Sequence, residues 1–191
     1  MRAALLFLLV TAVATAAPKH KPGAVVLVVD RSGSMQGAKL DAAKKAMLAA
    51  AAQLAPDDQI AIITFDSDAT TLVPLTKPGK SLANTIDKLQ AGGGTNILPA
   101  LKSAYEILKP LKLAHRHIIV MTDGEAPSDG IAQLLSDMHA SGVTASTVGV
   151  QGADRYLLQT IAEGGDGRLY MLDDVSALPK IFEKEVATAL R

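Results

Sequence analysis

The segment of residues 24–35, with the sequence AVVLVVDRSGSM, decides the fold. Its first six residues are apolar and mostly β-branched, without the polar alternation of a strand that has one face in water. Such a run predicts a strand buried on both faces, which is typical of a parallel sheet. Polar residues follow from Asp30 to Ser34, so we expect the strand to end at Asp30 and the chain to turn there at the edge of the sheet.

Strand and helix patterns alternate along the rest of the chain. An amphipathic helix is predicted over residues 40–54, with Lys39 and other charged residues on its outer side. Further strands are predicted over residues 60–65, 70–74, 117–121, 143–150 and 168–172, and further helices over residues 81–89, 98–108, 128–140, 155–162 and 175–189. The pattern predicts a Rossmann-like α/β fold: about six strands, mostly parallel, with one antiparallel edge strand and helices on both faces.

The amino terminus has the layout of an export signal. Met1 and Arg2 precede an apolar run, and Ala14-Thr15-Ala16 fits a small-x-small cleavage site. We therefore predict a signal peptide over residues 1–16, a short linker over residues 17–23 and one domain over residues 24–191. The alternative is an uncleaved, short membrane anchor, although a spanning helix needs roughly 20 apolar residues. Either interpretation places the domain outside the cytoplasm, in the periplasm or secreted.

Composition excludes several classes of partner. The chain has 19 basic and 19 acidic residues, so no general attraction to nucleic acid or to an anionic membrane is expected. Tryptophan is absent and aromatic residues make up 3%, which argues against platforms for stacked bases. Cysteine is also absent, so the chain has no disulfide, thiolate nucleophile or thiolate metal site.

Three predicted strand ends carry polar residues in a combination that plain turns do not require. Asp30, Ser32 and Ser34 follow the first strand, Thr95 follows a run of three glycines, and Asp123 follows the strand at residues 117–121. Ligand sites in parallel α/β sheets gather at the carboxyl ends of the strands, so we expect these side chains to converge. Two carboxylates and three hydroxyls are hard oxygen ligands, which suit Mg²⁺, Mn²⁺ or Ca²⁺.

Taken together, Asp30-x-Ser32-x-Ser34, Thr95 in a glycine-rich loop and Asp123 before a glycine resemble the metal-ion-dependent adhesion site of von Willebrand factor type A domains. The five positions match without a gap. The resemblance extends over residues 24–190, and the sequences GGGTNI at 92–97 and ASTVGV at 145–150 make it most similar to bacterial members.

The resemblance implies a role for each of the five residues. Ser32 and Ser34 would ligate the cation directly, Thr95 directly or through water, and Asp30 and Asp123 mainly through water. Neutral inner ligands leave the cation's charge available at the open position, which an Asp or Glu of a protein partner would complete. The resemblance therefore implies a cation-dependent protein-binding module with no catalytic residue, and a last helix that can slide when the site takes a ligand.

Other interpretations remain open. All five residues could be helix caps and turn residues. A metal-dependent hydrolase of phosphate or ester groups is a second alternative. Such an enzyme needs a general base and a Lys or Arg side chain beside the metal. Arg31 is the only basic residue within the motifs. A third is a scaffold whose metal is only structural. His115 and His117 lack a third ligand, so they are interpreted as surface residues and not as a zinc site.

Overall fold

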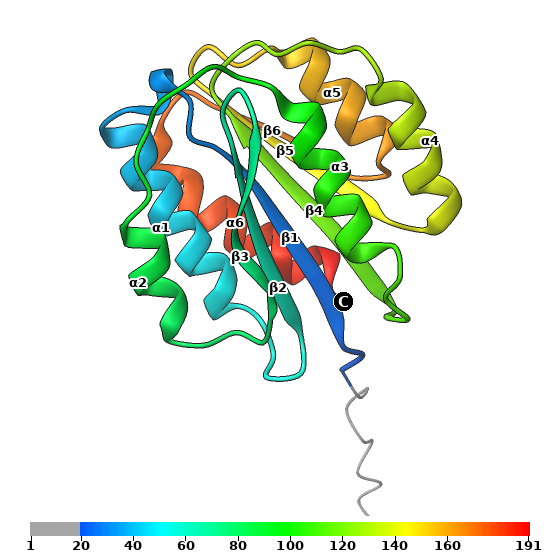
Figure 1. Cartoon of the computed structure of the whole chain (residues 1–191). Coiled ribbons are helices and arrows are strands. Elements are labelled where there is room, and N and C mark those ends of the chain that lie inside the picture. The colour runs from blue at the N-terminus through cyan, green and yellow to red at the C-terminus, as the bar shows by residue number, and fades with distance from the viewer. Residues whose placement is uncertain (1–19) are drawn as a thin grey trace, which may run out of the picture.

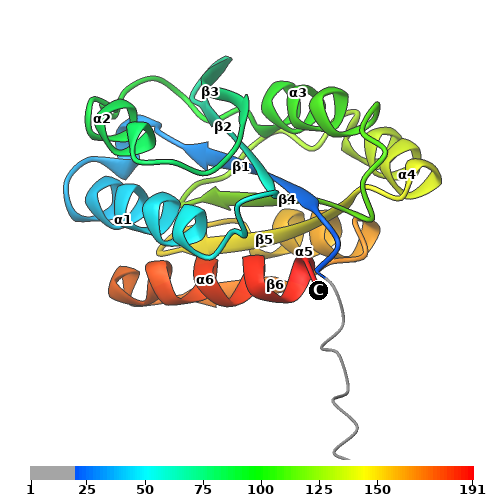
Figure 2. The same cartoon turned by 90° about the horizontal axis from the view of Figure 1, so that it is seen from below.

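A single six-stranded sheet forms the centre of the molecule, with helices on both faces (Figures 1 and 2). The structure is a computed structural model that describes residues 20–191, so the predicted signal peptide over residues 1–16 lies outside the described residues. The strand order is β3-β2-β1-β4-β5-β6. All neighbouring strands are parallel except β2 and β3, so the predicted mostly parallel sheet with one antiparallel edge strand is confirmed.

The elements follow the predicted alternation closely. The strands are β1 (Gly23–Asp30), β2 (Gln59–Phe65), β3 (Ala69–Thr76), β4 (His115–Thr122), β5 (Thr144–Val150) and β6 (Leu169–Leu172). The helices are α1 (Ala38–Ala52), α2 (Ser81–Asp87), α3 (Ile97–Leu108), α4 (Ile131–Ser141), α5 (Arg155–Gly164) and α6 (Leu178–Ala189), with short 3₁₀ turns at Gly33–Met35 and Val175–Ala177. The helix α4 begins later than the predicted residue 128, because Gly130 adopts a left-handed conformation with φ 81° directly before it.

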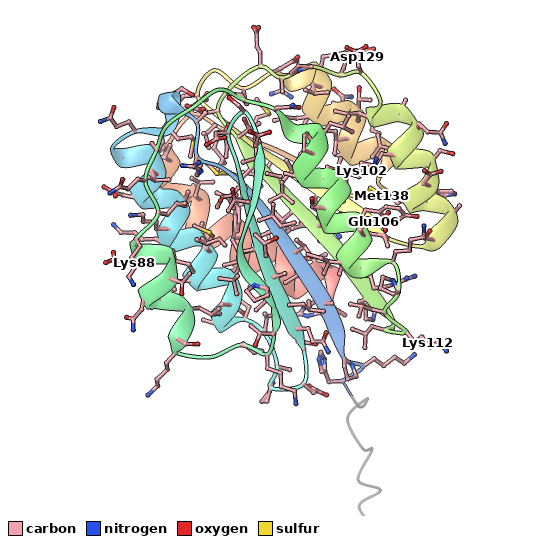
Figure 3. All side chains as sticks on the ribbon, in the orientation of Figure 1. Lys88, Lys102, Glu106, Lys112, Asp129 and Met138 are labelled. Atoms are coloured by element: carbon pink, nitrogen blue, oxygen red, sulfur yellow. The ribbon has the colours of Figure 1, made fainter. Side chains whose placement is uncertain are left out.

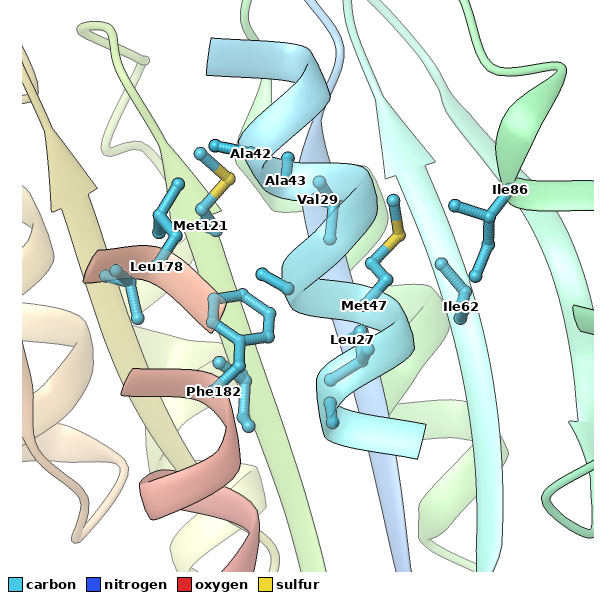
Figure 4. Packing of buried hydrophobic residues seen from close by; sticks show 14 of the residues in the cluster. Leu27, Val29, Ala42, Ala43, Met47, Ile62, Ile86, Met121, Leu178 and Phe182 are labelled. Atoms are coloured by element: carbon cyan, nitrogen blue, oxygen red, sulfur yellow. The ribbon is translucent and has the colours of Figure 1, made fainter. Parts of the chain in front are cut away.

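Strand β1 lies in the middle of the sheet, between β2 and β4, and all eight of its residues are buried. Its side chains alternate between two cores. Val25, Leu27 and Val29 face the core under α1, α2 and α6, whereas the alternate residues face the core under α3, α4 and α5. Figure 4 shows the first core, where Met47 of α1 and Phe182 of α6 pack over the sheet. This double burial explains the unbroken apolar run in the sequence.

The two ends of the described chain lie side by side at the amino-terminal edge of the sheet (Figure 1). A β carbon placed on Gly23, the first residue of β1, would lie 2.7 Å from Cδ2 of Leu190, which follows α6. The carboxyl ends of the five mutually parallel strands lie at the opposite edge. None of the helices within residues 20–191 combines the length and the apolar character needed to cross a membrane.

Helix α6 is attached to the sheet by a buried carboxylate as well as by apolar packing. Glu185 is inaccessible to solvent and accepts hydrogen bonds from Ser146 Oγ (2.6 Å), Tyr170 Oη (2.6 Å), and Arg168 Nε (2.9 Å) and Nη2 (2.8 Å). Nε2 of His117 lies 3.1 Å from Oε1 of Glu185. Burial favours the neutral acid, but the surrounding donors outweigh it and hold the pKa of Glu185 well below its ordinary value. We call these five residues the Glu185 cluster.

Candidate metal centre

Four of the five predicted site residues meet at the carboxyl edge of the sheet. Asp30 is the last residue of β1, and Asp123 follows the last residue of β4. Between them, Ser34 Oγ donates to Asp123 Oδ1 at 2.7 Å, and the hydroxyl oxygens of Ser32 and Ser34 are 3.0 Å apart. The loop after β1 therefore carries its two serine hydroxyls toward the end of β4.

Asp30 is buried, and both of its carboxylate oxygens accept hydrogen bonds. The backbone N–H of Ser32 donates to Oδ1 at 2.7 Å, and the hydroxyl of Thr122 donates to Oδ2 at 2.5 Å. Burial raises the pKa of Asp30 above its ordinary value, and these hydrogen bonds only partly oppose the effect. The contribution of Thr122 is not predicted by the motif, because a threonine at the end of a buried strand is unremarkable on its own.

Thr95, the fifth residue, was wrongly predicted to follow a strand. It lies in the loop between helices α2 and α3, and this loop contacts the loop after β1. The backbone N–H of Gly33 donates to the carbonyl of Gly93 at 3.1 Å. A β carbon on Gly124 would lie 3.4 Å from Oγ1 of Thr95, so this hydroxyl lies beside the residue that follows Asp123. Gly93 has φ 83°, a conformation that disfavours any residue with a side chain, so the glycine run shapes this approach. All five predicted residues are thus gathered at one edge of the sheet.

Lys39 is a member of the site that the sequence analysis did not identify. Its Nζ lies 2.5 Å from Oδ2 of Asp123, whose side chain is fully buried, and 3.3 Å from the carbonyl of Gln151. Placing Lys39 on the outer side of the first helix was wrong. One signal was available: Lys39 lies in the first turn of α1, where the helix dipole disfavours a positive charge.

The other charged residues near the site serve different contacts. Arg31 forms an ion pair with Asp66, the first residue after β2. Asp66 is therefore not the freely solvated turn residue that its position suggests, since Oδ1 also accepts from the backbone N–H of Asp68. Glu125 and Asp68 are exposed on neighbouring loops. Asp129, labelled in Figure 3, lies in the same loop as Glu125.

The histidines lie away from this edge. Predicting His117 as a surface residue was wrong, since it is 2% exposed and belongs to the Glu185 cluster. His20 lies at the amino-terminal edge, where its Nε2 is 2.8 Å from Oδ1 of Asp58, with Asp57 nearby. The same carboxylate of Asp58 accepts the backbone N–H of Gly23, so it anchors the start of β1.

The donor set at the carboxyl edge is compatible with a small divalent cation. Two ligands that share an octahedral edge around Mg²⁺, each at its preferred 2.0–2.1 Å, lie about 3 Å apart. The hydroxyls of Ser32 and Ser34 have this separation, 3.0 Å. None of the five residues offers nitrogen or sulfur, so the set suits a hard cation.

A Rossmann-like α/β domain with polar loops at the carboxyl edge of its sheet is the class that fold and site define. The chain belongs to the von Willebrand factor type A domain family, whose model matches residues 24–184.

Similar proteins are found across several kingdoms. The chain is 36% identical over 119 residues to inter-alpha-trypsin inhibitor heavy chain H4 of Bos taurus, covering 54% of this chain and 13% of that protein. It is 31% identical over 175 residues to an uncharacterized protein of Synechocystis, covering 86% and 42%. The chain thus spans less than half the length of these relatives.

Solved structures share the fold at lower identity. A von Willebrand factor type A structure from Catenulispora acidiphila superposes with a TM-score of 0.82 at 24% identity, covering 89% of this chain and 43% of that one. Proximal thread matrix protein 1 from the mussel byssus, solved with a zinc-occupied metal-ion-dependent adhesion site, superposes with a TM-score of 0.77 at 23% identity, covering 90% and 46%.

Proposed function

We propose that this chain is an exported, cation-dependent protein-binding module that captures an Asp or Glu side chain of a partner. The observation that carries the proposal is the convergence of two buried carboxylates and two serine hydroxyls, joined by the 2.7 Å bond from Ser34 to Asp123. Helix caps and turns alone do not require four such groups, from the ends of the two strands β1 and β4, to meet at one point.

The residues divide into two kinds. Ser32, Ser34 and Thr95 offer neutral oxygens as direct ligands, with Thr95 acting directly or through water. Asp30 and Asp123 act mainly through water and through the hydrogen bonds that orient the loop. The bound cation, Mg²⁺, Mn²⁺ or Ca²⁺, would supply a Lewis-acidic position for one partner carboxylate oxygen.

Comparison with known proteins supports the metal. The mussel protein holds zinc in the corresponding kind of site, which shows that such a loop arrangement accepts a divalent cation in that protein. The choice of Mg²⁺, Mn²⁺ or Ca²⁺ here rests on the all-oxygen donor set. The same proposal includes no enzymatic role, because the histidines of residues 20–191 lie away from this edge of the sheet.

Affinity capture tests the proposal. The purified protein is incubated with extracytoplasmic proteins of its source, with magnesium in one arm and a chelator in the other, and Asp123→Ala serves as the matched variant. We expect partners that are retained with magnesium and lost in both the chelator arm and the variant. If magnesium raises only the melting temperature and retains no partner, the metal is structural and the binding function is wrong.

A further inference from the structure

We infer that Lys39 sets the charge of the candidate metal centre: it weakens cation binding and thereby strengthens the grip on a partner carboxylate. This inference rests on the proposed function, since it assigns a role within the same site. It concerns a residue outside the five-residue motif, and it predicts that the two affinities change in opposite directions when the ammonium is removed.

The contact between Lys39 and Asp123 places a fixed positive charge against the site. Nζ lies 2.5 Å from Oδ2 of Asp123, whereas Oδ1 of the same carboxylate faces Ser34. One oxygen of Asp123 is thus directed to a proposed ligand and the other to the ammonium. The side chain of Lys39 is 22% exposed and that of Asp123 is fully buried, so water screens the pair only partly.

The two carboxylates of the site have partners of different charge. Asp30 is held by neutral donors alone, the N–H of Ser32 and the hydroxyl of Thr122. Asp123 instead has a full positive charge as its partner. Because the ammonium is charged, its contact with Asp123 changes the net charge of the site as well as orienting the carboxylate.

A count of formal charges gives the consequence. Asp30, Asp123 and Lys39 carry a net charge of about −1 without metal, about +1 with a divalent cation, and about 0 once a partner carboxylate is bound. Without the ammonium, the same three states carry about −2, 0 and −1. The lysine therefore opposes the first binding step and favours the second, because the loaded site stays cationic until the carboxylate arrives.

The position of Lys39 also has a local cost. It is the second residue of α1, where the partial positive charge of the helix start repels a cation. An acidic or neutral residue would be preferred there, and Asp41 in the same turn has the favourable sign. The contact with Asp123 offsets that cost, and the same contact adds a positive charge to the site.

The test measures cation and carboxylate binding separately in Lys39→Gln. Glutamine keeps a donor for Asp123 and removes the charge. Mn²⁺ is titrated and followed by electron paramagnetic resonance, and acetate is then titrated into the Mn²⁺-loaded protein while water proton relaxation reports displaced metal-bound water. We expect Mn²⁺ affinity to rise roughly tenfold and acetate affinity to fall roughly threefold.

Two variants control for charge and for folding. Lys45→Gln removes the same charge from an exposed position on the same helix and should leave both affinities unchanged. Lys39→Arg keeps the charge and should bind Mn²⁺ and acetate like the parent protein. If Lys39→Gln is too unstable without metal, it is prepared in Mn²⁺ and its rate of metal loss to a chelator is measured, for which we expect a slower rate.

The outcomes separate the two proposals. If the parent protein binds Mn²⁺ but Lys39→Gln binds it equally or more weakly, or loses it at an equal or faster rate, Lys39 is only a structural contact and this inference is wrong. A simultaneous fall of both affinities leads to the same conclusion. If the parent protein binds no divalent cation at all, the proposed function fails and the role of Lys39 fails with it.

Discussion

Two sets of buried carboxylates lie in different parts of the molecule and are built differently: Glu185 lies under helix α6 on one face of the sheet, and Asp30 and Asp123 lie at its carboxyl edge. Glu185 accepts hydrogen bonds from Ser146 of β5, from Tyr170 of β6, and from Nε and Nη2 of Arg168, which directly precedes β6. At the carboxyl edge, Asp30 and Asp123 each accept from two donors, fewer than Glu185, and the hydroxyl oxygens of Ser32 and Ser34 lie 3.0 Å apart. The contacts of Glu185 are all made within the chain, whereas we propose that Asp30 and Asp123 also take part in holding a cation.

The contrast shows in the direction of the pKa shifts. The donors around Glu185 favour the charged carboxylate and lower its pKa, while burial of Asp30 dominates and raises its pKa. A buried carboxylate with enough hydrogen-bond and charge partners stabilises the native structure. A buried carboxylate with too few partners lowers the free energy of unfolding until a ligand supplies the missing partner. The comparison agrees with a structural role for the Glu185 cluster and with the binding role that we propose for the candidate metal centre.

The largest effect is expected for Glu185→Ala, which should lower the free energy of unfolding by about 3 kcal/mol. Removing one partner of a buried ion pair leaves the remaining groups without hydrogen bonds. We expect a loss at the low end of the range found for such removals, because Arg168 is 43% exposed and can reach water. Urea denaturation measures the change. Glu183→Ala, on the same helix, should stay within about 0.5 kcal/mol; a similar loss in both variants would contradict the role of the cluster.

The same variant tests whether helix α6 and the candidate metal centre communicate. The resemblance implies that the last helix slides on ligand binding, and Glu185 holds α6 in its register against β5 and β6. Magnesium affinity of folded Glu185→Ala, measured by calorimetry, should differ from that of the parent protein if α6 and Thr95 are coupled. An unchanged affinity would show that helix α6 and the candidate metal centre act independently.

The next largest effect concerns Asp123→Ala, for which we expect roughly 100-fold weaker magnesium binding and loss of cation-dependent partner capture. The free energy of unfolding should change by only about 1 kcal/mol, since Lys39 can turn toward solvent when its partner is gone. Calorimetry and melting without metal measure the two quantities. Asp129→Ala, at an exposed position nearby, is the control. Full magnesium-dependent binding by Asp123→Ala would remove this residue from the site.

A smaller effect is expected for Thr95→Ala, with magnesium affinity reduced roughly 10-fold and the fold intact. The hydroxyl of Thr95 lies beside Gly124 and contributes one ligand, directly or through water. Thr95→Ser keeps the hydroxyl and should retain most of the affinity. Equal binding by the alanine and serine variants would show that only the methyl group or the backbone of Thr95 matters.

A dependence of stability on pH is also expected, and it belongs to the Glu185 cluster. Burial lowers the pKa of His117 in the folded protein. Below a pH of about 6.5, the unfolded chain therefore binds a proton that the folded chain does not, and the free energy of unfolding falls as the pH falls. Glu185 acts in the same direction below about 4.5, because its pKa is lowered in the folded state. Each group contributes a slope of up to about 1.4 kcal/mol per pH unit.

Urea denaturation between pH 7.5 and 4 measures both stages. His117→Gln should flatten the upper stage, whereas His139→Gln, at a position whose side chain is 70% exposed, should leave it as in the parent protein. A slope in His117→Gln as steep as in the parent protein between pH 6.5 and 5 would contradict the assignment of this stage to His117.

The sequence predicts most of the fold, because local patterns decide it. The apolar run before Asp30 has to lie inside a sheet, and the alternation of strands and helices then leaves few topologies. The convergence of Asp30, Ser34 and Asp123 follows from that topology, since parallel strands end at one edge. Their ligand roles remain a prediction, as does the signal peptide over residues 1–16.

Contacts between distant side chains could not be predicted in the same way. Lys39 and Asp123 are 84 residues apart, and the helical pattern alone places the lysine in solvent. Glu185 likewise fits an amphipathic helix, and nothing nearby indicates that it is buried. A polar Ser146 within a buried strand was a usable signal, because buried hydroxyls need partners. The identity of those partners depends on how α6 lies on the sheet.

The meeting of Gly23 and Leu190 at the edge farthest from the candidate metal centre has a consequence for how such a domain is carried. Polypeptide attached at either end would leave from nearly the same point, so the domain can be spliced into a surface loop of a host protein without stretching it. A host protein joined to these ends would hold the domain at the amino-terminal edge of the sheet. The loops that carry Asp30 and Asp123 would then face away from the host.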